Sequence, residues 1–182
     1  MKRFNRDIMD ILESVVVALV AVMIIFTLVC RIYVVDGPSM NSTLAHGDRL
    51  LVSQLLYTPK QGDIVCFVAE NHQQKVLVKR VIAVAGQTVD ITPDYKVSVN
   101  GEVLNETYID PIRDHCFDYS HDAGCTHPAG IELPYTVKEG EVFVLGDNRD
   151  NSTDSRQLGA VEEKYLLGKM LIRIWPNTGV VK

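Results

Sequence analysis

A serine stands on a rigid turn early in the chain. Residues 36–40 read Asp-Gly-Pro-Ser-Met, and the Gly37-Pro38 pair restricts the backbone immediately before Ser39. A serine held on such a turn is a candidate nucleophile if a nearby base can take its proton. The ordinary alternative is a turn or helix-cap residue. The G-x-S-x-G motif of α/β-hydrolases does not occur around Ser39.

Lys79 is the strongest candidate for that base. In the run 76–84 a strand's side-chain period of two places Lys79 on an apolar face. The other members of this face are Leu77, Val81 and Ala83. An ammonium among apolar side chains loses hydration, which lowers its pKa and makes the neutral amine available as a base. The alternative is a lysine on an edge strand that discourages aggregation.

The five histidines are weaker candidates for the base. Each lies in a polar turn or an irregular region, without neighbours that would fix the orientation of its ring. They are His46, His72, His115, His121 and His127. We interpret them as solvated loop residues.

A polar segment follows an apolar strand near the C-terminus. Residues 146–156 read Gly-Asp-Asn-Arg-Asp-Asn-Ser-Thr-Asp-Ser-Arg after the run VFVL, which is typical of a strand end that opens into a site loop. Its carboxylates, guanidinium groups and hydroxyls could hold a buried lysine amine in place. A solvated charged loop is the alternative, and composition alone favours it.

Short β-rich runs separated by turn signals carry these residues and predict a mostly antiparallel β domain. The runs lie at 48–57, 63–69, 75–86, 95–104 and 140–147. Asn100-Gly101 predicts a two-residue hairpin within the fourth run, because both turn positions require a positive φ. Residues 105–136 show little periodicity, and we expect an irregular excursion between strands.

The N-terminal region has the character of a membrane helix. Residues 14–30 form a run of 17 positions without a charge. As a helix this run covers about 26 Å, and snorkelling at Glu13 and Arg31 extends it towards the ~30 Å hydrocarbon core. A cleaved secretory signal is the main alternative, but no clear small-x-small site follows the run. A buried helix of a soluble core would show a polar stripe.

Charges around this helix predict a topology and three regions of the chain. The basic residues Lys2, Arg3 and Arg6 precede the apolar run, which places the N-terminus in the cytoplasm. We therefore predict a cytoplasmic N-terminus at 1–13, a single-pass transmembrane helix at 14–35 and an extracytoplasmic domain at 36–182.

Composition excludes two classes of partner. Eighteen basic against 23 acidic residues give a net charge of −5, opposite to what binding nucleic acid requires. The four cysteines lack paired C-x-x-C spacing and no histidine cluster accompanies them, so we predict no metal. Outside the cytosol Cys116 and Cys125 could form a disulfide, and the sequence leaves both states open. Cys66, in the apolar run 64–68, is typical of a core thiol.

Taken together, the serine, lysine and polar segments resemble bacterial type I signal peptidase (leader peptidase), in the short form with one N-terminal span. The three boxes are residues 37–44, 79–86 and 146–156, and the resemblance extends from the span to Trp175. It implies a β catalytic domain of the signal peptidase type in a membrane-bound serine endopeptidase without a cofactor. The substrates would be exported precursors with small residues at −1 and −3, cleaved through an acyl-enzyme.

The resemblance also implies a role for each matching residue. Ser39 corresponds to the nucleophile, Lys79 to the general base and Ser152 to the hydroxyl that orients the lysine amine. The supporting positions are the residue after the nucleophile, an ion pair and two bracing residues: Met40, Arg80 with Asp147, and Asp154 with Arg156.

Two positions depart from or vary within the family pattern. Ser42 replaces a frequent proline, and Gly37 stands where some members carry a serine that donates to the oxyanion. The Ser39 backbone N–H is therefore the safest member of the oxyanion hole.

Two other classes of protein compete with this interpretation. A non-catalytic membrane-anchored β-domain that binds envelope partners would leave the co-occurrence of the three boxes unexplained. A Ser-Lys self-cleaving protease of the repressor type shares the chemistry, but its soluble cytosolic setting does not fit the apolar N-terminal run.

Overall fold

The computed structural model describes residues 2–70, 74–92, 96–109 and 131–181. The chain divides into two compact units, Met1–Arg31 and Ile32–Lys182. The helical elements are α1 Lys2–Val29, η1 Arg149–Asn151, α2 Ser155–Leu158 and η2 Glu163–Tyr165. The strands are β1 Cys30–Val34, β2 Arg49–Ser53, β3 Ile64–Ala69, β4 Lys75–Val84, β5 Thr88–Ile91, β6 Val97–Val99, β7 Glu102–Val103, β8 Tyr135–Thr136, β9 Glu141–Leu145, β10 Val161–Glu162 and β11 Leu166–Trp175. Every registered strand pair is antiparallel, which confirms the predicted fold class at this level.

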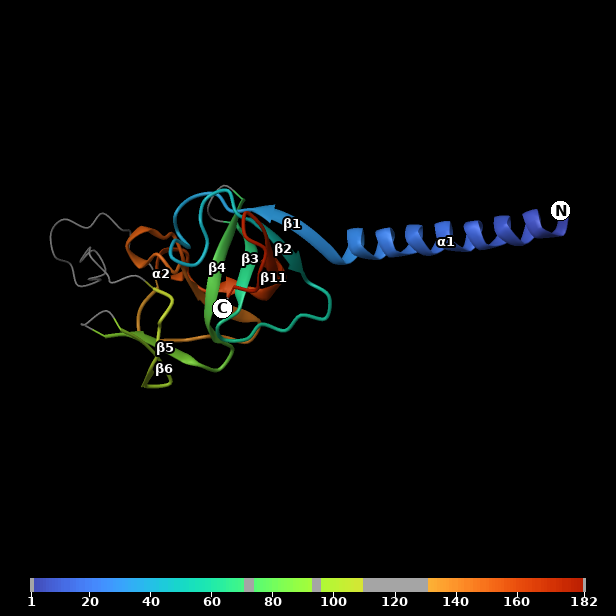
Figure 1. The fold of residues 1–182 in the computed structure, drawn as a ribbon. Coiled ribbons are helices and arrows are strands. Elements are labelled where there is room, and N and C mark those ends of the chain that lie inside the picture. The colour runs from blue at the N-terminus through green and yellow to red at the C-terminus, as the bar shows by residue number, and fades with distance from the viewer. Residues whose placement is uncertain (1, 71–73, 93–95, 110–130, 182) are drawn as a thin grey trace. The chain divides into compact units, whose positions relative to one another are not determined.

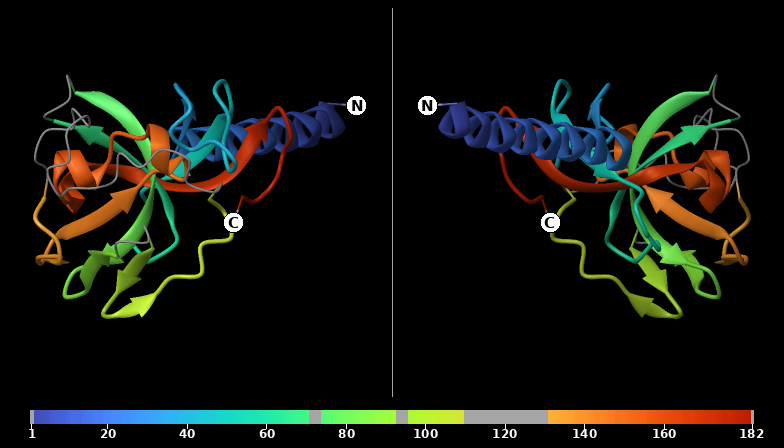
Figure 2. Two further views of the ribbon diagram at one scale, coloured as in Figure 1. Left: turned by 90° about the vertical axis from the view of Figure 1, so that its left-hand side faces the viewer. Right: turned by 90° about the vertical axis from the view of Figure 1, so that its right-hand side faces the viewer.

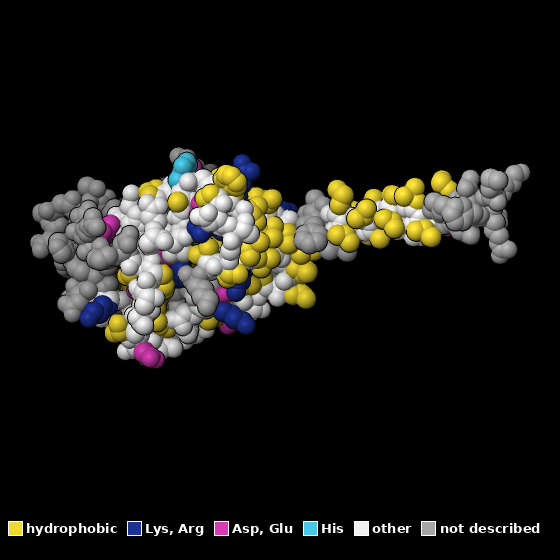
Figure 3. Space-filling view, viewed as in Figure 1, with side chains coloured by type: hydrophobic (Ala, Val, Ile, Leu, Met, Phe, Trp, Pro, Cys, Tyr) yellow, Lys and Arg dark blue, Asp and Glu magenta, His cyan; other side chains and the backbone are white. Residues whose placement is uncertain are grey.

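The N-terminal unit is a single long helix. The sequence of α1 contains neither Gly nor Pro, so nothing interrupts its backbone hydrogen bonds. Apolar side chains lie along the visible face of its described part (Figure 3), and those of residues such as Val17, Leu19 and Ile24 are exposed. Among the residues that the structure describes, no helix is both long and apolar enough to cross a membrane.

The helix bounds differ from the predicted 14–35 at both ends. Helix α1 begins at Lys2 and ends at Val29, and Cys30–Val34 form strand β1. The apolar run beyond Arg31 is rich in β-branched and aromatic residues, which favour extended backbone. Pairing of β1 with β2 at the edge of a sheet provides the backbone partners that a helix would otherwise supply.

The candidate site residues lie on a seven-stranded sheet and on the segments that connect its strands. Its order is β1-β2-β11-β3-β4-β9-β10, and Figure 1 shows β2, β11, β3 and β4 close together. Strand β11 lies between β2 and β3 although the sequence did not predict it. Gly168 interrupts its apolar pattern and lies at a register shift. A Cβ on Gly168 would come within 2.4 Å of the Ser53 carbonyl oxygen, so this close strand approach requires glycine.

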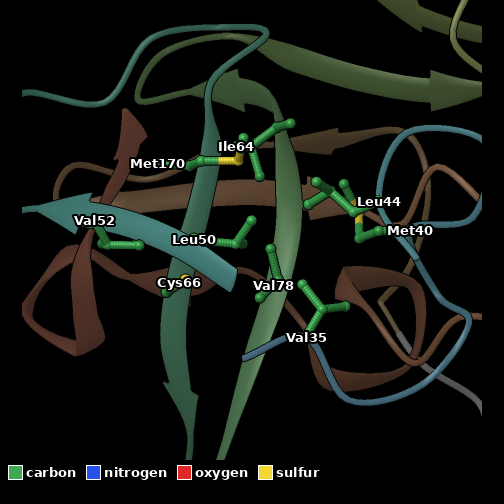
Figure 4. Packing of buried hydrophobic residues seen from close by; sticks show 9 residues of the cluster. All are labelled: Val35, Met40, Leu44, Leu50, Val52, Ile64, Cys66, Val78 and Met170. Atoms are coloured by element: carbon green, nitrogen blue, oxygen red, sulfur yellow. The ribbon is translucent and has the colours of Figure 1, made fainter. Parts of the chain in front are cut away.

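A hydrophobic cluster supports the turn that carries Ser39. Figure 4 shows Met40 and Leu44, from the loop after β1, in the same cluster as Ile64 of β3 and Val78 of β4. Met40 and Leu44 are fully buried. Packing of Met40 and Leu44 in this cluster therefore fixes the turn that carries Ser39.

A smaller sheet, β7-β6-β5-β8, completes the β unit and lies below the larger sheet in both views of Figure 2. The predicted hairpin at Asn100-Gly101 is confirmed, with φ values of 53° and 81°. Residues 135–136 form β8 and pair with β5. The prediction of an irregular excursion over 105–136 is therefore wrong at its C-terminal end. The predicted strand 48–57 is shorter, because the backbone turns after Ser53 and Tyr57 N–H donates to Gln54 O.

Candidate active site

Ser39 lies on a tight turn between β1 and β2. Gly37 takes φ +99°, a conformation that other residues rarely adopt, and Asn41 N–H donates to Pro38 O at 2.9 Å. Leu44 N–H donates to Met40 O at 2.7 Å. These contacts make the segment compact and leave the Ser39 side chain partly exposed.

Lys79 reaches Ser39 from the middle of β4. Its side chain is buried, with 1% of its surface exposed. The amine Nζ lies 2.7 Å from Ser39 Oγ and donates to Val78 O at 2.9 Å. The structure thus brings together the two residues that the sequence predicts as nucleophile and base.

Burial changes the acidity of the Lys79 amine. Loss of hydration lowers its pKa from 10.5 to about 8, against the charge of Asp154 and with a smaller contribution from Arg156. A substantial fraction of the amine is therefore neutral near pH 8. A neutral amine 2.7 Å from a hydroxyl can accept its proton.

The apolar surroundings of Lys79 differ in one respect from the sequence prediction. Leu77 and Val81 belong to one hydrophobic cluster, as expected for alternating positions. Ala83 belongs to another, because the register of β4 with β9 shifts between Val81 and Ala83. The predicted apolar face therefore ends at Val81.

Two buried ion pairs hold the polar segment 146–156: Arg80–Asp147 joins it to β4, and Arg156–Asp154 lies within it. Arg80 donates to both oxygens of Asp147, from Nε at 2.9 Å and from Nη2 at 2.7 Å. Arg156 contacts Asp154 in the same way, at 2.7 and 2.8 Å. Thr43 Oγ1 donates to Asp147 Oδ2 at 2.5 Å and so joins the serine turn to the first pair.

Asp154 remains ionised despite its complete burial. Burial alone would raise its pKa, but the charge and hydrogen bonds of Arg156 and the N–H of Gly146 hold it well below its ordinary value. Asp154 also caps α2 by accepting from the N–H of Arg156. One carboxylate thus fixes both the start of α2 and the end of β9.

Ser152 is not hydrogen-bonded to Lys79 in this structure, so the role that the family resemblance implies for it stays a prediction. Its Oγ is buried and forms no hydrogen bond of ordinary geometry with any described residue, although its proximity to Asp154 helps to lower the pKa of that carboxyl. The second hydrogen bond of Lys79 goes to Val78 O instead. A Cβ on Gly146 would come within 2.1 Å of Ser152 Oγ and 2.5 Å of Ser39 O. Ser152 and the nucleophile turn therefore meet at Gly146.

Five residues of the site were not predicted from the sequence. Thr43, Tyr108, Asn148 and Arg149 contact a predicted site residue or its turn. Glu106 joins the site through Arg149 and Tyr108. Thr43, Asn148 and Arg149 lie inside the quoted boxes, so box membership could have identified them. Glu106 and Tyr108 lie in the aperiodic region and carry no such signal.

The backbone conformation at position 42 explains why Ser42 stands where the family frequently has proline. Its φ is 76°, whereas a proline ring holds φ near −65°. Its hydroxyl donates to Tyr108 O at 2.6 Å. Ser42 thus allows a turn that proline could not form here.

The other candidate groups lie outside the Ser39–Lys79 contact. Cys66 is buried, and burial raises the pKa of its thiol to about 12, in keeping with a core thiol. His46 is exposed and accepts from Gly37 N–H at 3.2 Å. The other four histidines, Cys116 and Cys125 fall outside the described residues. Among the described residues, no group of acidic, His or Cys side chains could hold a metal ion.

Comparison with known proteins identifies the family. Residues 8–175 match the family described as signal peptidase, peptidase S26. The chain is 35% identical over 171 residues to signal peptidase I P of Bacillus subtilis subsp. natto, covering 92% of this chain and 89% of that protein. It is 32% identical over 182 residues to signal peptidase IB of Staphylococcus aureus, covering 94% and 92%. A crystal structure of a signal peptidase I from Enterococcus faecalis is similar with a TM-score of 0.45 at 27% identity, over 63% of this chain and 98% of that one.

These matches define the class of protein: a serine peptidase related to signal peptidase I. The chain belongs to the signal peptidase family, peptidase S26. The resemblance drawn from the three boxes is confirmed, and so is the expectation of an enzyme. The non-catalytic β-domain is correspondingly disfavoured.

Proposed function

We propose that this chain removes N-terminal signal peptides from exported precursors through an acyl-enzyme on Ser39, with Lys79 as general base. The observation that carries the proposal is the 2.7 Å contact between Ser39 Oγ and a buried Lys79 amine whose pKa is lowered to about 8. Membership of a signal peptidase family gives the substrate class.

Acylation begins with proton transfer from Ser39 to Lys79. The neutral amine accepts the hydroxyl proton while Oγ attacks the scissile carbonyl carbon. The Ser39 backbone N–H stabilises the resulting oxyanion. The Lys79 ammonium then donates its proton to the leaving nitrogen as the peptide bond breaks, which releases the mature protein. The signal peptide stays on Oγ as an ester.

Deacylation repeats the proton transfer with water. Lys79, neutral again, takes a proton from a water molecule that attacks the ester carbonyl, and the returned proton restores the Ser39 hydroxyl. The hydrogen bond to Val78 O keeps Nζ in place during both halves of the reaction.

The N-terminal half of β4 is the proposed pairing site for the substrate. Residues 75–79 pair with β3 on one side, whereas β9 pairs with β4 only from Arg80 onward. Among the described residues, the other backbone edge of 75–79 therefore has no strand partner. An extended peptide added to this edge would lie beside Lys79. The preference for small side chains at −1 and −3 remains an implication of the family resemblance.

Anchoring at a membrane by α1 completes the proposal, with the N-terminus in the cytoplasm and the β unit outside. The exposed apolar side chains of α1 favour a lipid surrounding over water, and the basic residues before the uncharged run favour this orientation. Enzyme and signal peptide held in one bilayer would meet at a raised effective concentration.

Cleavage by the full-length protein in detergent tests the proposal. A precursor with Ala-x-Ala before the cleavage site should give two fragments whose masses locate the cut after the second Ala. Ser39→Ala removes one oxygen and should abolish cleavage with an unchanged circular dichroism spectrum. Cleavage by Ser39→Ala at the wild-type rate contradicts the nucleophile assignment. Cleavage by neither protein favours the non-catalytic alternative.

A further inference from the structure

One short segment contacts all three boxes of the site. Ser42 Oγ, from the serine box, donates to Tyr108 O at 2.6 Å. The Arg80 guanidinium, from the lysine box, lies 3.9 Å from the centre of the Tyr108 ring. Arg149, from the polar segment, forms an ion pair with Glu106. We call residues 106–108 the brace.

The ion pair of the brace is buried. The side chains of Arg149 and Glu106 are 1% and 6% exposed. Arg149 donates from Nη1 to Glu106 Oε2 at 3.0 Å and from Nη2 to Oε1. Tyr108 adds a third hydrogen bond, from its hydroxyl to Glu106 Oε1 at 2.8 Å. Burying a charged pair costs hydration energy and is a weak source of stability, so this fully bonded arrangement suggests a role in geometry.

Arg149 transmits this arrangement to the nucleophile turn through Gly146. Its Nε donates to Gly146 O at 3.0 Å, and Gly146 N–H donates to Asp154 at 2.9 Å. Hydrogen bonds therefore fix both the N–H and the carbonyl of Gly146. Because Gly146 packs so closely on Ser39 O, a shift of Gly146 must move the Ser39 backbone.

Asn148 reinforces the same connection. Its backbone N–H donates to Ser39 O and its side-chain amide to Pro38 O, both at 3.1 Å. Asn148, next to Arg149 in the chain, thus holds the backbone carbonyls of Pro38 and Ser39, which set the direction of the Ser39 side chain.

We propose that Glu106 is a positioning residue: through Arg149 it holds Gly146 against the Ser39 backbone and so maintains the contact between Ser39 and Lys79. Glu106 touches neither reacting group, and the inference rests on the proposed roles of those two residues. Displacement of a reacting atom by about 1 Å can slow catalysis by about 100-fold, so loss of the brace should reduce kcat more than it changes KM.

Glu106→Gln tests this inference in the full-length protein in detergent, with an Ala-x-Ala peptide as substrate. We expect kcat to fall by about 10- to 100-fold with KM within about twofold of wild type. Glu102→Gln, at an exposed position of β7, is the matched control and should leave both constants unchanged. A wild-type kcat in folded Glu106→Gln overturns the inference.

A double variant separates positioning from the cost of burying an unpaired charge. Glu106→Gln with Arg149→Met removes both charges but does not restore the Arg149–Gly146 hydrogen bond. Positioning predicts that kcat stays low in this variant, whereas recovery of kcat contradicts it.

Tyr108→Phe keeps the inference testable if Glu106→Gln does not fold. It removes only the hydroxyl that bonds Glu106 and retains the ring beneath Arg80, so a smaller fall in kcat is expected with an unchanged Tm. Where Glu106→Gln does not fold, an unchanged kcat in Tyr108→Phe overturns the inference. Ser39→Ala is measured in parallel, because activity in that variant contradicts the proposed function itself, whereas a failure confined to the brace variants leaves it intact.

Discussion

The two sheets of the β unit bury different kinds of side chain. In the four-stranded sheet, Ser98 is the buried polar residue among those described, and the remaining buried side chains are apolar. The seven-stranded sheet and its loops bury a group of charged residues: Lys79, Arg80, Asp147, Arg149, Asp154 and Arg156. Buried charge is costly unless it is paired. The candidate site therefore lies in the part of the fold that buries charged side chains and pairs most of them.

Lys79 and Arg80 show how the larger sheet uses that burial. These neighbours on β4 are both cationic and almost completely buried. Arg80 has Asp147 as a bidentate partner, whereas Lys79 contacts a hydroxyl and a carbonyl. Burial lowers the pKa of the Lys79 amine, which lacks a direct carboxylate partner, to about 8. The comparison separates charges that hold the structure from the charge that can react.

The largest effect is expected when the reactive cation is removed. Lys79→Met should reduce kcat/KM by about 10⁴-fold or more, because no other group replaces the base. The same change should raise the free energy of unfolding by ~1–4 kcal/mol at pH 7, since an incompletely paired buried charge disappears. Peptide cleavage and urea unfolding measure the two effects. Lys138→Met, at an exposed position, is the control and should change neither. Substantial activity in Lys79→Met points to a different base.

Removal of a charge that holds the structure should have the opposite effect on stability. Asp154→Asn leaves Arg156 buried beside a neutral amide and should lower the free energy of unfolding by about 3–5 kcal/mol. Urea unfolding at pH 7 measures the change, with the exposed Glu139→Gln as control. A loss below about 1 kcal/mol, typical of an exposed pair, contradicts the contrast drawn between the two kinds of charge.

The pH dependence sharpens the same contrast. Below pH 8 the rate should fall by about tenfold per pH unit as Lys79 is protonated, and it should level off above its pKa of about 8. A limb near pH 6.5, the ordinary range of histidine, contradicts the lysine mechanism. Initial rates of peptide cleavage between pH 6 and 10 provide the test.

The free energy of unfolding should also depend on pH through the titration of Lys79. Between the native pKa of about 8 and the ordinary value of 10.5, the unfolded chain binds the lysine proton and the native chain does not. Stability therefore rises with pH across this window, by about 3 kcal/mol in total relative to Lys79→Met. Below pH 8 the difference between the two proteins should be constant. Urea unfolding of both proteins across this range measures it, and a difference that stays constant from pH 8 to 10.5 contradicts the lowered pKa.

The smallest effect is expected in the four-stranded sheet. Gly101→Ala forces a side chain onto a residue with φ 81° and should cost about 1 kcal/mol of stability without a change in kcat. Gly179→Ala is the control, because a Cβ there meets nothing within 4 Å and no positive φ applies. A change in kcat from Gly101→Ala would show that the two sheets are coupled.

Local chemistry made part of this molecule predictable. The Asn100-Gly101 turn, the apolar runs of β3, β4 and β9, and the boxes holding Ser39 and Lys79 could all be identified from neighbouring residues. Each depends on a short-range rule, such as the φ preference of a turn residue or the period of a strand. Ser39 and Lys79 could therefore be named as a candidate pair before their geometry was known.

Tertiary contacts decided the rest, because they join residues far apart in the chain. Strand β11 forms where β2 and β3 supply backbone partners on both sides, despite the glycine within it. The end of α1 at Val29 depends on pairing between β1 and β2. Glu106 acquires its position from Arg149, 43 residues along the chain. The sequence by itself indicated Ser39 and Lys79 as candidates for nucleophile and base, whereas the 2.7 Å between them and the low pKa of the amine arise only in the folded sheet.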